Sequence, residues 1–195
     1  MKVSAVATLS SIALFGYASA AAVPASDAAS LGVYSPMVWS GSVTPGGPEV
    51  ELTGTLSEVV EQIIALNPDW EAQTDAAAAE APVSPPKKAL RWDGQPTCDK
   101  VAGDRIVSQY FLKWEVIPTL RRIGGNCGTK ARNCARLSCS WSSGVELCND
   151  RTSFVSIPCN QIADGAEMIA NKCVNVKGQL FDTTGWNVVV RGSKC

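Results

Sequence analysis

Eight cysteines are the residues of this chain whose type and spacing point most directly to chemistry. All of them lie in the last 98 residues, and the first 97 residues contain none. This density is typical of a small secreted domain held by disulfides, because oxidised thiols supply stability that a modest core cannot. The sequence therefore predicts four intramolecular bridges, formed by Cys98, Cys127, Cys134, Cys139, Cys148, Cys159, Cys173 and Cys195.

Few residues are suited to an enzymatic role. The chain contains no histidine, which excludes Ser-His-Asp and Cys-His hydrolysis, histidine-based nuclease and phospholipase chemistry, and ordinary histidine-containing zinc sites. Pairing of the thiols removes thiolate nucleophiles and cysteine metal sites. A carboxylate pair for glycoside cleavage survives, and Asp164 and Glu167 share a predicted helix face. Such a pair is commonly a solvated surface, so we predict no catalytic residue, no metal site and no cofactor.

Tryptophan suggests a third class of function, glycan binding, because an exposed indole can stack on a sugar ring. Four tryptophans follow residue 88. Trp114 and Trp141 fall on predicted buried stripes and are expected in the core. Trp92 and Trp186 remain as the candidates for glycan contact.

The chain begins with the pattern of a secretory signal peptide over residues 1–20. A short positive start precedes an apolar stretch over residues 5–17, and Ala18-Ser19-Ala20 is a small-residue cleavage site. The apolar stretch is shorter than the ~18 residues that a membrane span requires. We predict cleavage after Ala20, with Ala22 as the alternative, no transmembrane segment, and export to an oxidising extracellular location.

Residues 21–88 are predicted to be an acidic, largely disordered pro-segment. They carry nine acidic residues, no basic residue before Lys87, and many alanines, prolines and serines. Such a segment buries too little apolar surface to offset its ordering entropy. One part differs, because Thr55 and Glu58 have the spacing of a capping box and an apolar helical pattern follows them up to Asn67. This predicts a short amphipathic helix near residues 56–66 that needs a partner surface.

The pair Lys87-Lys88 follows two prolines and is the predicted site of a kexin-type processing protease. A trim after Arg91 is one alternative, and an N-terminal arm that is never removed is the other. Cleavage after Lys88 would separate a segment with two basic and nine acidic side chains, net −7, from residues 89–195, which carry fourteen basic and nine acidic side chains, net +5. The acidic segment could then shield a domain that favours anionic partners. A weakly basic surface is also a common means of staying soluble.

Residues 89–195 are predicted to fold as one cysteine-rich α+β domain. The first helix, capped by Asp104, has a stripe at α-helical spacing formed by Val107, Phe111, Trp114 and Ile117. The second helix follows Pro158 and has a stripe formed by Ile162, Ala166, Ile169 and Cys173. Short strands around residues 137–147, 154–157 and 179–190 complete the pattern. Two helices on one face of an antiparallel sheet give a two-layer sandwich stabilised by disulfides.

The predicted hairpin at residues 137–147 and the second helix exclude two of the possible bridges. A three-residue loop, Ser142-Ser143-Gly144, would place Trp141 opposite Val145 and Cys139 opposite Leu147, so that Cys148 faces the other side. This register excludes a Cys139–Cys148 bridge. Cys159 and Cys173 lie fourteen residues apart along a helix, about 21 Å at the helical rise, and cannot pair either.

The cysteine pattern of residues 134–195 resembles that of the small secreted killer toxins of smut fungi and of related cysteine-rich fungal effectors. The resemblance consists of Cys134-Ala-Arg-Leu-Ser-Cys139, a helix opened by Cys159 and closed by Cys173, and a final strand ending in cysteine. It implies a two-helix α/β sandwich, secretion, and action on another cell, in some killer toxins through interference with calcium uptake. The basic segment 130–136 departs from the toxin pattern, and no functional residue is carried over.

We therefore expect a secreted, non-enzymatic, toxin- or effector-like protein of fungal origin that acts in virulence or competition by binding at or in a host or competitor cell. The expected partner is an anionic surface or a membrane protein of that cell, with no nucleic acid and with the protein as a monomer. A small carbohydrate-active enzyme or glycan-binding module, using carboxylates or exposed tryptophan, is the alternative.

Overall fold

The computed structural model describes residues 34–80, 92–98, 100–102 and 106–195, and it confirms an α+β fold with four disulfides. The main sheet has the strand order β1 (Tyr34–Ser35), β6 (Asn133–Ser140), β7 (Ser143–Asn149), β10 (Trp186–Gly192), β9 (Gly178–Asp182) and β4 (Thr97–Cys98). A second sheet has the order β3 (Glu49–Gly54), β2 (Met37–Ser42), β5 (Asn126–Thr129) and β8 (Val155–Pro158). The fold is therefore richer than the single antiparallel sheet predicted, and its β1–β6 pair is parallel.

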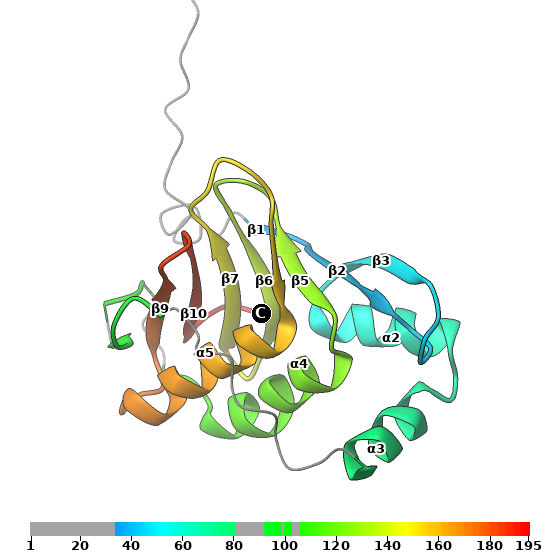
Figure 1. Cartoon of the computed structure of the whole chain (residues 1–195). Coiled ribbons are helices and arrows are strands. Elements are labelled where there is room, and N and C mark those ends of the chain that lie inside the picture. Colours follow the sequence, from blue (N-terminus) through cyan, green and yellow to red (C-terminus); the bar gives the residue numbers. More distant parts are fainter. Residues whose placement is uncertain (1–33, 81–91, 99, 103–105) are drawn as a thin grey trace, which may run out of the picture.

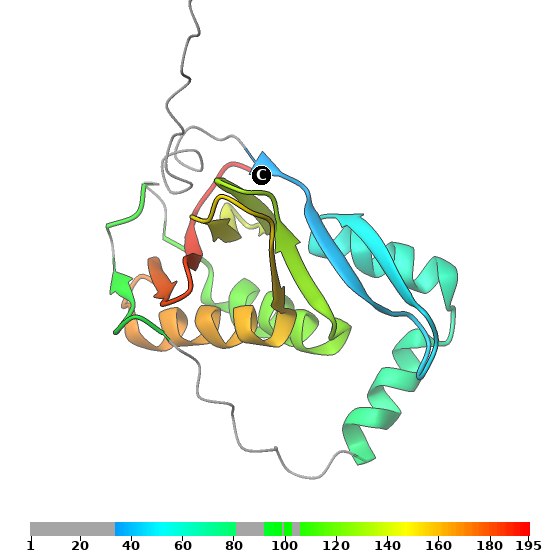
Figure 2. The same cartoon turned by 45° about the horizontal axis from the view of Figure 1, so that its top comes forward.

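One face of the main sheet is covered by three neighbouring helices (Figures 1 and 2). These are the π-helix η1 (Phe111–Val116), α4 (Ile117–Ile123) and α5 (Cys159–Lys172). The predicted stripe of α5 is confirmed, because Ile162, Ala166 and Ile169 are fully buried. The closing hairpin is confirmed as well, with every residue of β10 buried.

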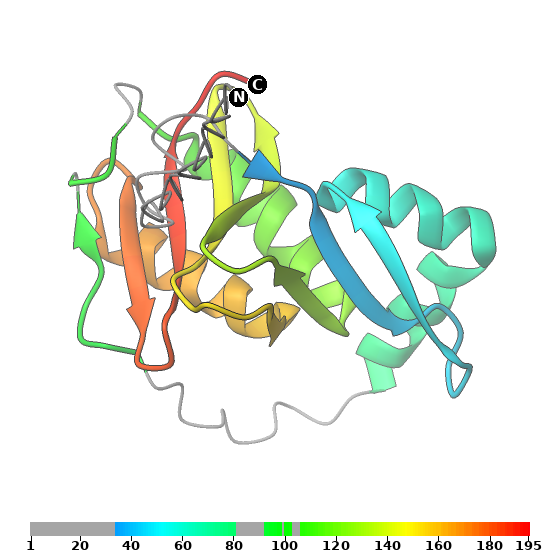
Figure 3. The same cartoon turned by 90° about the horizontal axis from the view of Figure 1, so that it is seen from above.

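The N-terminal region, residues 34–80, is part of the fold, so the prediction of a largely disordered segment is wrong for these residues. Strand β2 lies inside the second sheet, paired with β3 on one side and with β5 of the cysteine-rich part on the other. Helices α2 (Leu56–Leu66) and α3 (Trp70–Glu80) follow β3 along the chain (Figure 3). The disorder prediction averaged the composition of the whole segment 21–88 and missed the short run from Met37, whose alternate side chains are buried.

Trp39 anchors β2 to the cysteine-rich part. Its side chain is fully buried, and its indole Nε1 donates to the carbonyl oxygen of Gly124 at 3.1 Å. Gly125 makes this approach possible, because it has a positive φ of 60° and a Cβ there would lie 2.4 Å from the Ser40 carbonyl oxygen. Gly124 and Gly125, which end α4, therefore also form the surface against which Trp39 of the N-terminal region packs.

Helix α2 confirms the predicted helix near residues 56–66 and its capping box. The backbone N–H of Thr55 donates to Glu58, and the Thr55 side chain accepts from the backbone N–H of Glu58. The hydrogen bonds from Thr55, backbone first, hold the pKa of Glu58 below its ordinary value. The partner surface that the helix needs is the core itself, since Leu56, Val59 and Ile63 are buried.

The first predicted helix of the cysteine-rich part is wrong in one respect. Residues 111–116 form a π-helix, in which the Ile117 N–H bonds the Leu112 carbonyl five residues back, instead of an α-helix. The wider turn buries Phe111, Leu112 and Val116. Trp114, which an α-helical period places with Phe111 and Ile117, turns outward instead. The predicted cap Asp104 lies outside the described residues.

The register predicted for the β6–β7 hairpin is also wrong. Ser140 pairs with Ser143, so the turn has two residues, Trp141 and Ser142, with φ values of 52° and 56°. Positive φ at both central positions is the geometry of a type I′ turn, which usually carries Asn-Gly. No glycine marks this turn, and a β-bulge between Arg136 and Ser138 shifts the register beyond it.

All eight cysteines are paired. The bridges are Cys98–Cys173, Cys127–Cys159, Cys134–Cys148 and Cys139–Cys195. Both predicted exclusions are confirmed, although the hairpin argument used the wrong register. In the observed register Cys139 stands opposite Gly144, and Cys134 stands directly opposite Cys148.

Candidate functional site

The tryptophans are arranged in the reverse of the predicted way. Trp186 is 1% exposed, and Trp92 is partly buried and packs edge-to-face on it with ring centroids 5.2 Å apart, so neither is an exposed indole. Trp114 and Trp141, predicted to lie in the core, are 71% and 74% exposed. Trp114 is exposed because it lies in the π-helix η1, and Trp141 is exposed because it lies in the two-residue turn between β6 and β7.

Three of the exposed aromatic residues, Tyr110, Trp114 and Trp141, come from segments that lie next to one another. Eight large apolar side chains are exposed in the described part of the chain, and five of them come from three neighbouring segments. We call this set the aromatic end; it consists of Ile106, Tyr110, Trp114, Trp141 and Val174. A concentration of exposed apolar side chains on a small domain is typical of an interaction site.

Hydrogen bonds hold the three segments of the aromatic end together. The N–H of Ser108 donates to the Ser143 hydroxyl at 2.9 Å, and this hydroxyl donates to the carbonyl of Trp141 at 3.2 Å. The N–H of Val107 donates to the carbonyl of Asn175 at 3.4 Å. The start of η1, the β6–β7 turn and the loop after α5 therefore lie side by side.

The C-terminal segment braces the β6–β7 turn from another side. The N–H of Ser193 donates to the carbonyl of Ser142 at 2.9 Å, and the Cys139–Cys195 bridge fixes the last residue to β6. Figure 3 shows this segment passing beside the hairpin. The turn that carries Trp141 is thus held by a disulfide and by hydrogen bonds to two other segments.

Trp141 adopts a backbone conformation that a bulky residue seldom occupies. Its φ of 52° lies in the left-handed region, which costs a non-glycine residue of order 1 kcal/mol or more. The side chain gains little in return from packing, because it is largely exposed. A strained, braced and exposed tryptophan is typical of a residue retained for contact with a partner.

The carboxylate pair kept as an enzymatic alternative is engaged in an ion-pair cluster. One nitrogen of Arg121 lies 3.1 Å from Asp164 Oδ1 and 2.7 Å from Glu167 Oε2. The predicted helix face therefore exists, but its two carboxylates share one guanidinium. A carboxyl group held in this way does not suit the role of a general acid in glycoside cleavage.

A second group of ionisable residues surrounds the buried Glu146 on the face of the main sheet opposite the helices. The Glu146 side chain is fully buried, and its Oε1 accepts from Arg191 Nε at 2.9 Å and from the Tyr34 hydroxyl at 2.7 Å. Arg191 also donates to the Tyr34 hydroxyl, and the Arg136 guanidinium lies 4.0 Å from the centre of the Tyr34 ring. The cluster joins β1, β6, β7 and β10.

Burial raises the pKa of the Glu146 carboxyl, and the positive charge of Arg191 and the hydrogen bonds from Tyr34 and Arg191 oppose this rise. Its second oxygen, Oε2, is buried without a hydrogen bond. Because Glu146 shares its sheet face with the Cys134–Cys148 bridge and is enclosed, its role is to tie strands together rather than to meet a substrate.

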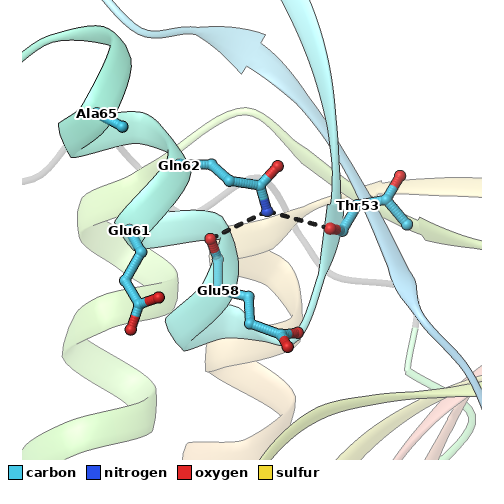
Figure 4. A pocket seen from close by; sticks show the side chains of 5 residues that line it. All are labelled: Thr53, Glu58, Glu61, Gln62 and Ala65. Carbon is cyan, nitrogen blue, oxygen red and sulfur yellow. Dashed lines mark hydrogen bonds between the residues drawn. The ribbon is translucent and has the colours of Figure 1, made fainter.

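An open depression lies between β3 and α2 and is lined by Thr53, Glu58, Glu61, Gln62 and Ala65 (Figure 4). Its polar groups are largely occupied by one another. The Gln62 amide donates to the carbonyls of Thr53 and Glu58, and the Glu58 carboxylate belongs to the capping box. The depression therefore reflects how α2 is fastened to β3.

Comparison with known proteins finds no matching family model, no similar curated sequence and no similar solved structure. The resemblance to killer toxins stays a prediction. The predicted processing residues Ala20, Lys87 and Lys88 lie outside the described residues. Within the described part of the chain, no helix has the length and hydropathy of a membrane span.

Proposed function

We propose that this chain is a secreted, non-enzymatic, toxin- or effector-like protein that acts by binding at or in another cell through its aromatic end. The observation that carries the proposal is Trp141, an exposed indole on a strained turn held by the Cys139–Cys195 bridge. Four disulfides and an N-terminal export pattern fit an extracellular location, because disulfides persist in oxidising compartments.

The engagement of the carboxylates supports a binding role over an enzymatic one. Asp164 and Glu167 share Arg121, and Glu146 is enclosed in the sheet. The exposed rings of the aromatic end, in contrast, contribute little to the core of the domain. Such side chains are better explained by contact with a partner than by folding.

Processing after Lys88 remains part of the proposal. We expect this cut to leave the N-terminal region bound to the cysteine-rich part and not to release it. Strand β2 pairs with β5, β1 pairs with β6, and Trp39 is buried against Gly124. A chain cut after Lys88 would therefore keep the N-terminal region as a second, non-covalently bound chain, since that region contains no cysteine.

The test is to apply the oxidised, secreted protein to plant tissue and to competing fungi, beside a reduced sample and the variant Trp141→Ala. We expect a response to the oxidised protein that is lost on reduction and strongly weakened in Trp141→Ala. A full response to Trp141→Ala would refute the role of the aromatic end. Hydrolysis of a polysaccharide by the pure protein would move the function to an enzyme.

A glycan-binding module is the second candidate, because Trp114 and Trp141 are exposed aromatic residues of the kind that stack on sugars. Pull-down on insoluble chitin and β-glucan separates it from the first candidate. Retention that depends on Trp141, in a protein without effect on cells, would favour glycan binding.

A further inference from the structure

The charges around the aromatic end are almost all positive. Lys113 lies between Tyr110 and Trp114 on η1 and is exposed. Lys194 is exposed beside the β6–β7 hairpin, since Arg136 donates to its carbonyl at 3.2 Å and the next residue is bridged to Cys139. In the described segments 106–116, 138–144, 172–178 and 193–195, Glu115 is the single acidic side chain.

The shape of the site also matters. Trp141 occupies a central position of a two-residue turn, so its ring projects from the tip of a hairpin instead of lying at the bottom of a groove. Small-molecule and sugar sites are usually concave and carry fixed polar partners. Indole and phenol rings that project beside lysines are characteristic of the interface of a lipid bilayer, where the ring sits at headgroup level.

We propose that the aromatic end docks on an anionic lipid bilayer. The rings of Trp141 and Trp114 enter the headgroup region, and Lys113 and Lys194 lie against the lipid phosphates. The π-helix serves this contact, because Trp114 is turned to the solvent side while Phe111 and Leu112 face the core. The inference rests on the proposed function in that it uses the same surface, and it names the partner.

Co-sedimentation with vesicles tests the aromatic contact. The full secreted chain is mixed with vesicles of phosphatidylcholine and phosphatidylserine, and with vesicles of phosphatidylcholine alone. We expect binding to the anionic vesicles, weakened about tenfold or more in Trp141→Ala, because a buried indole contributes ~25 cal/mol per Å². The matched control is Phe154→Ala, since Phe154 is exposed near the opposite end of β7. It should bind as the unaltered protein does.

The charge contribution is tested with lysine variants. Lys113→Ala should weaken binding to the anionic vesicles about fivefold, since a lysine near such a surface contributes ~1 kcal/mol. It should leave binding to phosphatidylcholine unchanged. Lys130→Ala, in the exposed loop at the other end of β6, is the control and should have no effect.

The proposal is overturned if folded Trp141→Ala, with four intact bridges, binds anionic vesicles like the unaltered protein. It is also overturned if the protein binds no vesicles but is retained on chitin or β-glucan, or forms Trp141-dependent dimers. Vesicle binding without any effect on cells would keep this inference and refute the proposed function. A Trp141-dependent effect on cells without vesicle binding would do the reverse.

Discussion

The N-terminal region and the cysteine-rich region, residues 92–195, share two sheets but are held in different ways. All four disulfides lie within the cysteine-rich region, where they close loops of 14 to 75 residues. The N-terminal region contains no cysteine and is fixed by strand pairing, by Trp39 and by the hydroxyl of Tyr34 in the Glu146 cluster. Composition separates the two regions clearly, whereas the fold joins them.

The positions of the disulfides therefore show which part of the unfolded chain is cross-linked. They do not show which residues belong to the folded domain. Cross-links act mainly by limiting the unfolded chain. The N-terminal region lacks them but contributes buried side chains to the same core, among them Met37, Trp39, Leu56, Val59, Ile63 and Trp70. Its stability thus depends on the other region, and its exposed surface can be acidic without making it disordered.

Reduction of all four disulfides should have the largest effect. Each bridge in such a domain contributes about 2–5 kcal/mol, comparable with the net stability, so the reduced protein should unfold. Near-ultraviolet circular dichroism and thermal unfolding measure this. Retention of the native spectrum after complete reduction would show that the core alone suffices.

Removal of single bridges refines this prediction. Replacing Cys98 and Cys173 by Ser opens a loop of 75 residues, and replacing Cys134 and Cys148 opens one of 14. Loop entropy predicts that the first variant loses about 1.5 kcal/mol more than the second. Urea unfolding of the two variants provides the comparison; equal losses would point to native-state packing instead.

Trp39→Ala should weaken the attachment of the N-terminal region to the cysteine-rich region. Truncation of a fully buried tryptophan costs about 3–5 kcal/mol, and the loss falls on the contact between β2 and the end of α4. Limited proteolysis should then remove the N-terminal region while the cysteine-rich region persists. Leu66→Ala, at an exposed position of the same region, is the control and should stay resistant.

Glu146→Gln should change how stability depends on pH, because burial outweighs the attraction of Arg191 in setting the carboxyl pKa, and the neutral amide still accepts hydrogen bonds but cannot ionise. The sign of the pH effect follows from burial, which raises the carboxyl pKa in the folded state. The native protein should lose stability as pH rises from the ordinary carboxyl pKa through the raised value.

The native protein and the Glu146→Gln variant are compared by chemical unfolding at several pH values. The variant should lack the fall in stability over this window, and Glu115→Gln, at an exposed site on η1, should retain it. The same pH slope in the Glu146→Gln variant would mean that another group titrates.

Thr55→Ala should have the smallest effect, about 1 kcal/mol, because it removes the capping box of α2. Thermal unfolding measures the loss, and Ser57→Ala in the same first turn is the matched control. A similar shift in both variants would indicate a loss of helix propensity instead of a loss of the cap.

Local signals were sufficient where one short motif decides the structure. The capping box located α2, the stripe of Ile162, Ala166 and Ile169 located α5, and alternation located the β9–β10 hairpin. Each of these depends on residues close in sequence. The eight cysteines likewise sufficed to predict four bridges, and helix geometry excluded Cys159–Cys173.

The candidate site was not predicted, because the exposure of its tryptophans depends on two irregular elements, the π-helix η1 and the turn between β6 and β7. The π-helix changes the spacing of the buried side chains, so Trp114 faces solvent. The sequence does not show this change, because it depends on the hydrogen bond from the Ile117 N–H to the Leu112 carbonyl, five residues back. The turn that carries Trp141 has no glycine, and its geometry is imposed by Ser143 and by the C-terminal brace. Contacts distant in sequence thus override the local pattern.

Native mass spectrometry of the folded protein after a cut at Lys88 tests most directly whether the two regions form one fold. The strand pairs β1–β6 and β2–β5 and the buried Trp39 predict that both pieces are detected as one complex, which separates under denaturing conditions without reductant. A native mass equal to residues 89–195 alone, with the rest of the chain lost, would contradict the account.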